Sequence, residues 1–295
     1  MIPTFHHRDF PLGLLLERKR GPVTIVLPAR EVADTIVPIV ESLLSLDELV
    51  DEVLVVDAAS EDGSAELAHA AGAEVHQESD LMPEIGPVQG KGDAMWRALS
   101  VARGEVVVFL DSDTHEFSSR FATGLLGPLL TRPEVEFVKG SFKRPFMSAS
   151  DDDRALGGGR VTELTARPLL SAFYPELAGF GQPLAGEFAA RRRTLDQLPF
   201  HTGFAIEIAM LFDARDLVGI GAMAQVDLEE RRNPHQPLSD LGPMAYAVLR
   251  TVIDRLRRDG RLADGVTPPL QTADGRLVEV ELTVRPPHAS LRARA

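Results

Sequence analysis

The amino-terminal half of the chain alternates apolar, β-branched runs with segments of helical periodicity. Residues 23–27 (VTIVL) predict a buried strand, and residues 35–46 repeat apolar positions at the spacing of a helix. Residues 52–57 (EVLVVD) predict a second strand, and residues 64–71 predict the helix that returns the chain. This order is typical of a βαβ unit.

The same alternation continues into a third unit. A short strand at residues 73–76 leads to a helix at 93–102, and residues 106–110 form the strongest strand pattern of the chain. That strand ends in Asp111-Ser112-Asp113. Repeated strand–helix units predict an α/β fold with a parallel, Rossmann-like sheet whose ligands bind at the carboxyl ends of the strands.

The pattern after residue 117 is mixed and contains no visible repeat. We expect helices at 118–130, 161–170, 203–212 and 239–257, strands at 135–139 and 223–228, a polar loop at 147–154, a hairpin around Asp274-Gly275, and a disordered final tail. These segments divide into an extension (1–21), a nucleotide-sugar-binding domain (22–145), an acceptor-binding region (146–260) and a carboxyl-terminal hairpin with tail (261–295).

Composition narrows the function classes. The 295 residues include no Cys, so thiolate metal sites and cysteine nucleophiles are excluded. The start of the chain is not a secretory signal, and no apolar run approaches bilayer-spanning length, so we expect a soluble, cytoplasmic protein without membrane partners. The net charge of −13 argues against nucleic-acid binding, and it means that an anionic substrate requires a local basic pocket.

Asp111 and Asp113 close a buried strand, where two carboxylates are costly unless a cation or several donors meet them. Their oxygens suit Mg²⁺ or Mn²⁺, and such a metal on a diphosphate neutralises charge on a leaving nucleotide. A helix cap or a solvated acidic turn is the alternative that the triplet alone leaves open.

Two further features fit a nucleotide at the same edge. Asp57 ends the second strand, where it can accept an N–H from a base, although a turn-forming role is an equal alternative. Lys91 lies between Gly90 and Gly92 at a helix start, so backbone amides and a cation can face a diphosphate. The spacing is not that of a Walker loop, and a plain glycine turn is the alternative.

A second group of residues predicts an anion site. Gly157-Gly158-Gly159 precede a helix start that carries Arg160 and Thr162. Glycines allow backbone to approach a ligand, Arg can bind a carboxylate or phosphate bidentately, and Thr can donate a hydroxyl. A flexible linker with a capping Thr is the alternative. Positive potential from Lys139, Lys143 and Arg144 is a further possibility, although a solvated basic face is the stronger interpretation for those three.

Taken together, several blocks resemble the glucosyl-3-phosphoglycerate and mannosyl-3-phosphoglycerate synthases, which are retaining glycosyltransferases of the GT-A fold. The resemblance runs over roughly residues 24–249, and its blocks are residues 90–97 (GKGDAMWR), 109–113 (FLDSD), 157–164 with 166–170, 182–187 (QPLAGE) and 224–228 (AQVDL). The combination is far more specific than any one block.

The resemblance implies transfer of a hexose from a nucleoside diphosphate sugar, with UDP-glucose favoured, to 3-phosphoglycerate. It implies a donor pocket with Pro28, Ala29, Asp57, Lys91, Asp111 and Ser112, an acceptor site with Gly159, Arg160 and Thr162, and catalytic roles for Lys91, Asp113 and Glu207. Retention would follow from front-face attack, in which the departing phosphate helps to deprotonate the acceptor. A surface acid or cap is the alternative for Glu207. A homodimer is also implied, with residues 244–256 as a candidate face or as core.

Three departures from the family pattern concern the nucleotide and the metal. Val32-Ala33 replaces acidic residues, and Ala58-Ala59 stands where a Ser-Gly pair is common. Asn233 occupies the position of a metal-binding His, so we expect either His235, two residues later, to join Asp111 and Asp113 at the metal, or His235 to contact the acceptor while Asn233 supplies an oxygen. A solvated loop histidine is the alternative for His235. These changes leave UDP or GDP, and glucose or mannose, as open alternatives.

Two other function classes remain at this stage. A nucleotidyltransferase also combines such a sheet with Lys and acidic metal ligands, but the glycine-rich loop expected after the first strand is absent. A degenerate nucleotide-sugar-binding module is the non-enzymatic alternative.

Overall fold

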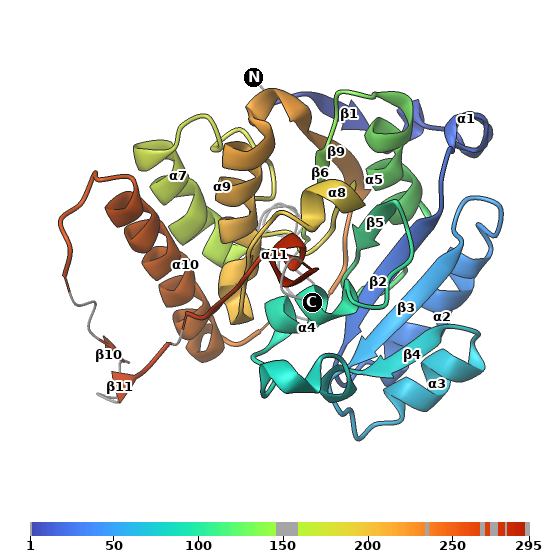
Figure 1. Ribbon diagram of the computed structural model, residues 1–295, viewed down its shortest axis with the longest axis horizontal. Helices are drawn as coiled ribbons and strands as arrows, with labels where there is room; N and C mark the ends of the chain where they lie inside the picture. The colour runs from blue at the N-terminus through green and yellow to red at the C-terminus, as the bar shows by residue number, and fades with distance from the viewer. Residues whose placement is uncertain are drawn as a thin grey trace.

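The computed structural model describes residues 2–145, 159–233, 236–265, 269–271, 277–280 and 282–292. Its helices and strands form an α/β structure (Figure 1). In chain order they are β1 Thr4–His6, α1 Leu12–Arg18, β2 Val23–Ala29, α2 Ala33–Leu44, β3 Glu52–Asp57, α3 Ser64–Ala70, β4 Glu74–Gln77, α4 Lys91–Ala98, β5 Val106–Phe109, α5 Arg120–Thr131, β6 Phe137–Lys143, a π-helical turn Thr162–Ala166, α7 Arg167–Phe173, β7 Phe188–Arg191, α8 Arg192–Leu195, β8 Phe200–His201, α9 Ile206–Val218, β9 Met223–Glu230, α10 Leu238–Arg258, β10 Leu270–Gln271, β11 Leu277–Val278, β12 Val284–Arg285 and α11 His288–Arg292.

One large sheet organises the described residues. Its strand order is β1-β9-β6-β7-β5-β2-β3-β4, and every neighbouring pair is parallel except those that involve β7. Because β7 runs opposite to the others, its first residue lies at the edge where the other strands end. That edge is where an α/β sheet binds its ligands.

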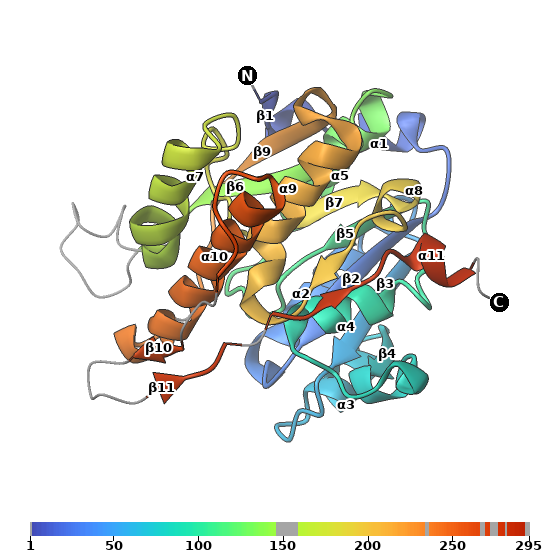
Figure 2. The same cartoon turned by 60° about the vertical axis from the view of Figure 1, so that its left-hand side comes forward.

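Alternate side chains of each strand enter two separate hydrophobic cores. Leu54 and Val56 of β3 belong to the core under α4, α9 and α10, whereas Val53 and Val55 belong to the core under α1, α2 and α5. Figure 2 shows helices on both sides of the sheet, with α7, α9 and α10 grouped on one of them. Burial on both faces explains why the strands read as continuous apolar runs rather than as alternating patterns.

Most predicted elements are present with shifted ends. The strand expected at 52–57 is β3, and the expected hairpin is confirmed by antiparallel pairing of β10 with β11. The helix expected at 161–170 begins as a π-helical turn and continues as α7. The loop expected at 147–154 lies outside the described residues.

The sheet contains two strands that the sequence patterns did not predict. β1 comes from the expected extension and pairs with β9, so residues 4–6 belong to the sheet. β7 is the antiparallel central strand, and it makes the sheet mixed rather than wholly parallel.

The expectation of a disordered tail is wrong as far as Arg292. β12 pairs with β8, and α11 packs through His288, whose ring lies 4.7 Å from that of Trp96. Contacts of buried Arg285, of the Trp96 indole and of a ring nitrogen of His288 hold this segment in place. Within the described part of the chain, no helix is long and apolar enough to cross a membrane.

Candidate active site

Charged side chains from the ends of five strands meet at one edge of the sheet. Asp111 follows β5, Arg144 follows β6, Arg231 follows β9, and Glu187 precedes the reversed strand β7. The ends of β2 and β3 add Ala29 and Asp57, and α4 and α9 contribute Lys91 and Glu207 from above. The strand order therefore brings residues far apart in sequence to one place.

Lys91 joins Asp111 to Glu207. Its Nζ pairs with Asp111 Oδ1 and lies 3.1 Å from Glu207 Oε1. Burial alone would lower the pKa of Lys91, but the two carboxylates outweigh it and hold the pKa above its ordinary value. Lys91 is therefore a fixed cation, and Glu207, with 13% of its side chain exposed, is not the surface acid that was its alternative.

The approach of Lys91 to Asp111 depends on Gly186. A Cβ at Gly186 would overlap both Asp111 Oδ1 and Lys91 Nζ, so any larger residue would force the ion pair apart. Gly186 therefore belongs to the site, although only the resemblance to the family drew attention to it.

Arg231 gathers three carboxylates on the other side of Asp111. Its Nη2 lies 3.1 Å from Asp111 Oδ2 and 2.5 Å from Asp113 Oδ1, and its Nε lies 2.9 Å from Glu187 Oε1. Glu187 is 1% exposed, and burial raises the pKa of its carboxyl despite the nearby Arg231. Neither Arg231 nor Glu187 was predicted as a site residue: Glu187 ends the block 182–187 that resembles the family, but no role was implied for it, and Arg231 lies in no recognisable motif.

Two more cations surround this group of acids. Lys139 is fully buried, and its Nζ donates to the Ala185 carbonyl at 2.7 Å, so the expectation of a solvated face is wrong for this residue. Burial lowers the pKa of Lys139 to about 8. Arg144 Nη2 donates to Asn233 Oδ1 at 3.1 Å, and Asp111, Asp113 and Glu187 attract its charge.

The residues expected at the donor are held together by short contacts. Ser112 Oγ donates to the Pro28 carbonyl at 2.5 Å, and Ala29 accepts a bond from the Ala58 amide at 2.9 Å. Asp57 is fully buried, and it accepts bonds from Ser60 and from Gln77 Nε2. These contacts fit the turn-forming alternative for Asp57, and a role in base recognition stays a prediction.

The residues expected at the acceptor also lie together. Gly159 has φ +76°, and a Cβ there would stand 3.8 Å from each of Arg144, Gln182 and Thr162. Arg144 thereby connects this group to the acids around Asp111. Arg160 is half-buried, and its Nη2 donates to the Gln236 carbonyl. Gly157 and Gly158 lie outside the described residues.

The geometry of Asp111 and Asp113 fits a divalent cation. One oxygen of each carboxylate approaches the same nitrogen, Nη2 of Arg231, so the two acids already converge on one point of positive charge. Asp113 has 44% of its side chain exposed, which leaves a face open to a ligand. His235 lies outside the described residues, so its role and that of Asn233 stay predictions.

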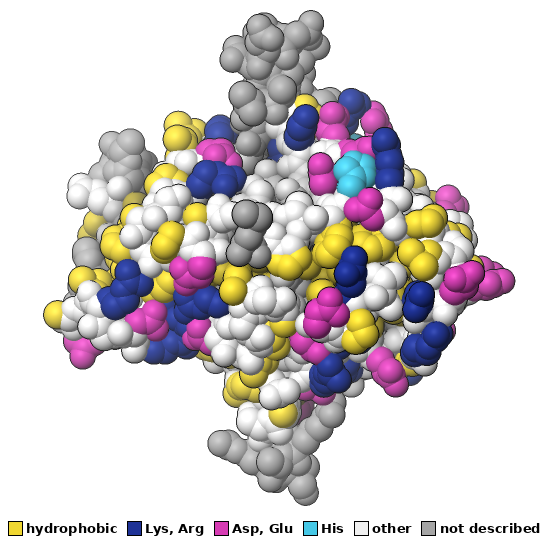
Figure 3. Space-filling model, turned by 90° about the horizontal axis from the view of Figure 1, so that it is seen from above, with side chains coloured by type: hydrophobic (Ala, Val, Ile, Leu, Met, Phe, Trp, Pro, Cys, Tyr) yellow, Lys and Arg dark blue, Asp and Glu magenta, His cyan; other side chains and the backbone are white. Residues whose placement is uncertain are grey.

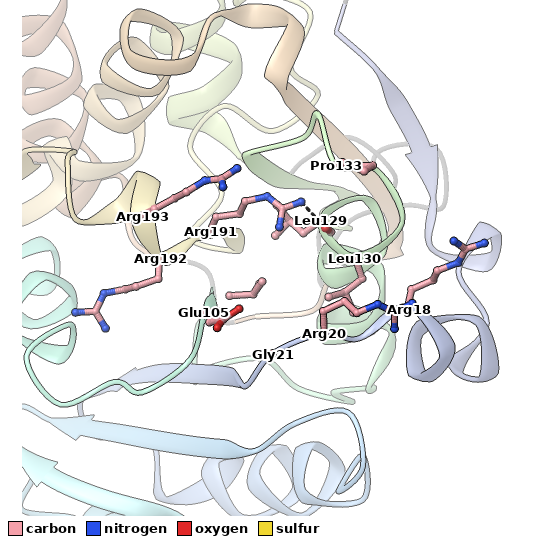
Figure 4. A pocket seen from close by; sticks show the side chains of 11 residues that line it. Arg18, Arg20, Gly21, Glu105, Leu129, Leu130, Pro133, Arg191, Arg192 and Arg193 are labelled. Carbon is pink, nitrogen blue, oxygen red and sulfur yellow. Dashed lines mark hydrogen bonds between the residues drawn. The ribbon is translucent and has the colours of Figure 1, made fainter.

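The cavity shown in Figure 4 lies at the opposite edge of the sheet, where β5 begins and β7 ends. It measures about 400 Å³ and is lined in part by Arg191, Arg192 and Arg193. These side chains do not converge in it: Arg191 and Arg192 bind backbone carbonyls, and Arg193 pairs with Glu136. The cavity is therefore not part of the candidate active site.

The surface seen from above in Figure 3 carries acidic and basic side chains interspersed with hydrophobic ones. This face offers no concentrated basic area of the kind that nucleic acids require, in agreement with the net charge of −13.

Fold and site together define a glycosyltransferase of the GT-A kind. Residues 24–168 match the model of glycosyl transferase family 2. Glucosyl-3-phosphoglycerate synthase from Petrotoga mobilis is 39% identical over 267 residues, which cover 88% of this chain and 82% of that protein. The synthase of the same name from Mycolicibacterium smegmatis is 41% identical and covers 92% of this chain and 90% of its own length.

Solved structures agree over nearly the whole chain. Mannosyl-3-phosphoglycerate synthase from Rubrobacter xylanophilus superposes with a TM-score of 0.89 at 47% identity, covering 98% of this chain and 97% of that chain. Glucosyl-3-phosphoglycerate synthase from Mycobacterium tuberculosis, in complex with Mn²⁺, UDP-glucose and phosphoglyceric acid, gives 0.87 at 39% identity and covers 99% of both chains. The chain belongs to the glucosyl-3-phosphoglycerate synthase family, and this family is one of glycosyltransferases rather than of nucleotidyltransferases or binding modules.

Proposed function

We propose that this chain transfers glucose from UDP-glucose to the hydroxyl of 3-phosphoglycerate with retention, giving glucosyl-3-phosphoglycerate. The observation that carries the proposal is the meeting of Lys91, Asp111 and Glu207 beside Arg144 and Gly159. The first three fit a donor diphosphate and its sugar, and the last two adjoin the residues expected to hold an acidic acceptor. Relatives bearing this name support the same substrates.

Each residue has a proposed task. Lys91 neutralises the diphosphate, Glu207 lies near the transferred sugar, and Pro28, Ala29, Ser112 and Asp57 surround the nucleotide. A resident Mg²⁺ or Mn²⁺ on Asp111 and Asp113, completed by His235 or Asn233, would stabilise negative charge on the leaving diphosphate. Since no side chain is placed as a nucleophile in the proposal, positioning and preorganised charge supply the catalysis.

The acceptor site gives an anionic substrate its place in an acidic protein. Gly159 lets backbone approach the acceptor, Arg160 binds its carboxylate or phosphate, and Thr162 donates a hydroxyl. Arg144, half-buried between Gly159 and the acids, holds the hydroxyl end of the acceptor near the donor. The guanidinium groups thereby offset locally the charge of −13 that would repel 3-phosphoglycerate.

Transfer to 3-phosphoglycerate, measured in parallel with UDP-glucose, GDP-glucose and GDP-mannose, tests the proposal. We expect product from UDP-glucose that requires both the acceptor and the metal and disappears in EDTA. A folded protein that binds UDP but transfers from none of these donors would contradict it.

Arg160→Ala is expected to raise the KM for 3-phosphoglycerate by roughly tenfold or more, because a charge-assisted contact is lost. The KM for UDP-glucose should change little. Exposed Arg18→Ala, at the opposite edge of the sheet, is the matched control. Equal effects of Arg160→Ala on both KM values would remove this residue from the acceptor site.

A second candidate is transfer of mannose from GDP-mannose. The solved mannosyl-3-phosphoglycerate synthase, at 47% identity, favours it. Glucose and mannose differ at one hydroxyl, and Ala58 and Ala59 depart from the family pattern beside the nucleotide. Faster transfer from GDP-mannose than from UDP-glucose in the assay above would select this candidate.

We also propose that the chain forms a homodimer, which the family resemblance supports. Buried side chains of α10, such as Val248 and Val252, belong to the hydrophobic core of the chain itself. An apolar hollow of about 310 Å³ lies between α7 and α10 and is lined by Phe173, Leu249 and Ile253 among others. Light scattering on the eluting protein tests the assembly, and a monomer mass at micromolar concentration would contradict it.

A further inference from the structure

The carboxyl-terminal residues 282–292, here called the C-terminal strap, cross α4 next to its start. Arg285 binds Asp93 with both ends of its guanidinium, Nε to Oδ1 at 2.8 Å and Nη2 to Oδ2 at 2.7 Å. Asp93 is fully buried and Arg285 is 8% exposed. A bidentate, desolvated pair of this kind fixes geometry as well as contributing energy. Figures 1 and 2 show α11 of the strap beside α4.

Asp93 also shapes the turn that carries Lys91. Its Oδ2 accepts the Gln89 amide at 2.9 Å, and its Oδ1 lies 3.4 Å from Arg97 Nε. Arg285 Nη2 reaches back to the Pro87 carbonyl at 3.2 Å. Removing Arg285 would leave a buried carboxylate without its strongest partner in the turn that sets the direction of Lys91.

The strap connects this turn to the start of α9. β12 of the strap pairs with β8, and the Thr202 amide donates to the Thr283 carbonyl at 2.9 Å. The next amide, that of Gly203, donates to the Gln89 carbonyl at 3.1 Å. Glu207 lies in the first turn of α9, just beyond these bonds. The strap therefore contacts both segments whose side chains form the Lys91–Glu207 pair.

Other strap contacts anchor it without touching the active site. Trp96 Nε1 donates to the Pro286 carbonyl at 2.9 Å, and His288 Nε2 lies 2.7 Å from the Trp96 carbonyl. The Ala289 amide donates to the Asp196 carbonyl at 2.8 Å. These bonds place Arg285 firmly against Asp93.

We propose that Arg285 is a positioning residue, which acts through Asp93 to set the Lys91–Glu207 pair at the donor. The role of that pair at the donor rests on the proposed function. Arg285 itself lies behind α4 and touches no reacting atom in the proposal.

Steady-state kinetics separates positioning from simple stability. Arg285→Met is expected to lower kcat/KM for UDP-glucose by roughly tenfold or more, as a small misplacement of a reacting group can do. The KM for 3-phosphoglycerate should change by less than about twofold. Arg285→Lys keeps the charge but loses the bidentate geometry, so its kcat/KM should lie between those of the wild type and of Arg285→Met. It also provides a folded variant if Arg285→Met is unstable. Arg191→Met, which removes an anchored Arg at the opposite edge, should lower Tm without this kinetic effect.

A double-mutant cycle provides the decisive readout. In a Lys91→Met background, Arg285→Met should change the residual kcat/KM by less than about twofold while still lowering Tm. A full, multiplicative loss in that background would show that Arg285 does not act through Lys91 and would overturn the proposal.

Hydrogen exchange distinguishes a failed positioning role from a failed function. Arg285→Met should speed amide exchange at residues 88–93 and 203–207 by roughly tenfold, and Arg191→Met should not. If the wild-type protein transfers no sugar but shows this exchange pattern, the proposed function fails and the coupling of strap to turn stands. Unchanged exchange in these segments would overturn the positioning role whatever the activity.

Discussion

At the residue scale, two nitrogen atoms each hold a pair of carboxylates together in the site. Arg231 Nη2 approaches both Asp111 and Asp113, and Lys91 Nζ approaches both Asp111 and Glu207. Asp111 is therefore held from two sides, and these cations outweigh its burial and keep its pKa well below the usual range. Asp113 has one such partner and more exposure, so it is the acid more open to a metal.

Asp113→Asn is expected to reduce metal-dependent transfer by roughly a hundredfold, because a charged ligand is lost while the residue size is kept. The fold should survive, since 44% of the side chain is exposed. Glucose transfer at saturating Mn²⁺ measures the loss, and Glu116→Asn, at an exposed acid on the same loop, is the control. Turnover near that of the wild type would exclude Asp113 as a metal ligand.

Gly186→Ala is expected to lower both kcat and Tm, because its methyl group would overlap Asp111 and Lys91. The loss in kcat should be roughly tenfold or more, as for other small misplacements of reacting groups. Gly221→Ala, where an added Cβ meets nothing within 4 Å, is the matched control and should leave both values near those of the wild type. A normal kcat for Gly186→Ala would show that the close Lys91–Asp111 approach is not required.

Elements explain which parts of the site the sequence could predict. β3 is an apolar run that ends in Asp57, and the apolar run of β5 continues through Leu110 to Asp111, so the sequence pattern located both the strands and their functional ends. β7 is as short as β5, but it has two alanines where β5 has valines and is followed at once by Arg192 and Arg193, so no pattern separated it from a loop. Glu187 reaches the site only because β7 runs backwards, which is a property of the sheet and not of any local segment.

The same reason hid the C-terminal strap. Its residues 282–292 contain two prolines and few apolar positions, which favour a disordered tail when read locally. What orders the strap is Asp93, almost two hundred residues earlier, together with Trp96. Long-range pairing of a buried Arg with a buried Asp leaves no trace in hydrophobic periodicity.

Lys139 of β6 makes the stability of the protein depend on pH in the alkaline range. Burial lowers its pKa from 10.5 to about 8. Between these values the unfolded chain binds the proton and the folded chain does not, so the stability contributed by this residue rises with pH. Relative to Lys139→Met, the wild type should gain at most about 1.4 kcal/mol per pH unit in this window. Urea unfolding at pH 7 to 10 measures the difference, and parallel stability curves would contradict the low pKa.

At the scale of the whole molecule, the net negative charge opposes the binding of anionic substrates, whereas the cations of the site favour it. The chain carries a net charge of −13, yet both substrates in the proposed reaction are anions. The site gathers Lys91, Lys139, Arg144 and Arg231 around four carboxylates, which leaves no surplus of positive charge for a diphosphate. A divalent cation would supply that surplus, so binding of nucleotide and metal should be strongly coupled.

Thermal unfolding tests this coupling in the intact protein. UDP at about a hundred times its Kd should stabilise the fold by about 2.7 kcal/mol, and thus raise Tm by roughly 5 °C, only when Mn²⁺ or Mg²⁺ is present. EDTA should abolish the shift, and Asp113→Asn should show little shift with or without metal, whereas Arg160→Ala should respond as the wild type does. An equal shift with UDP in EDTA would mean that Lys91 and Arg231 hold the diphosphate unaided, and the metal would then have to act in a later step than binding.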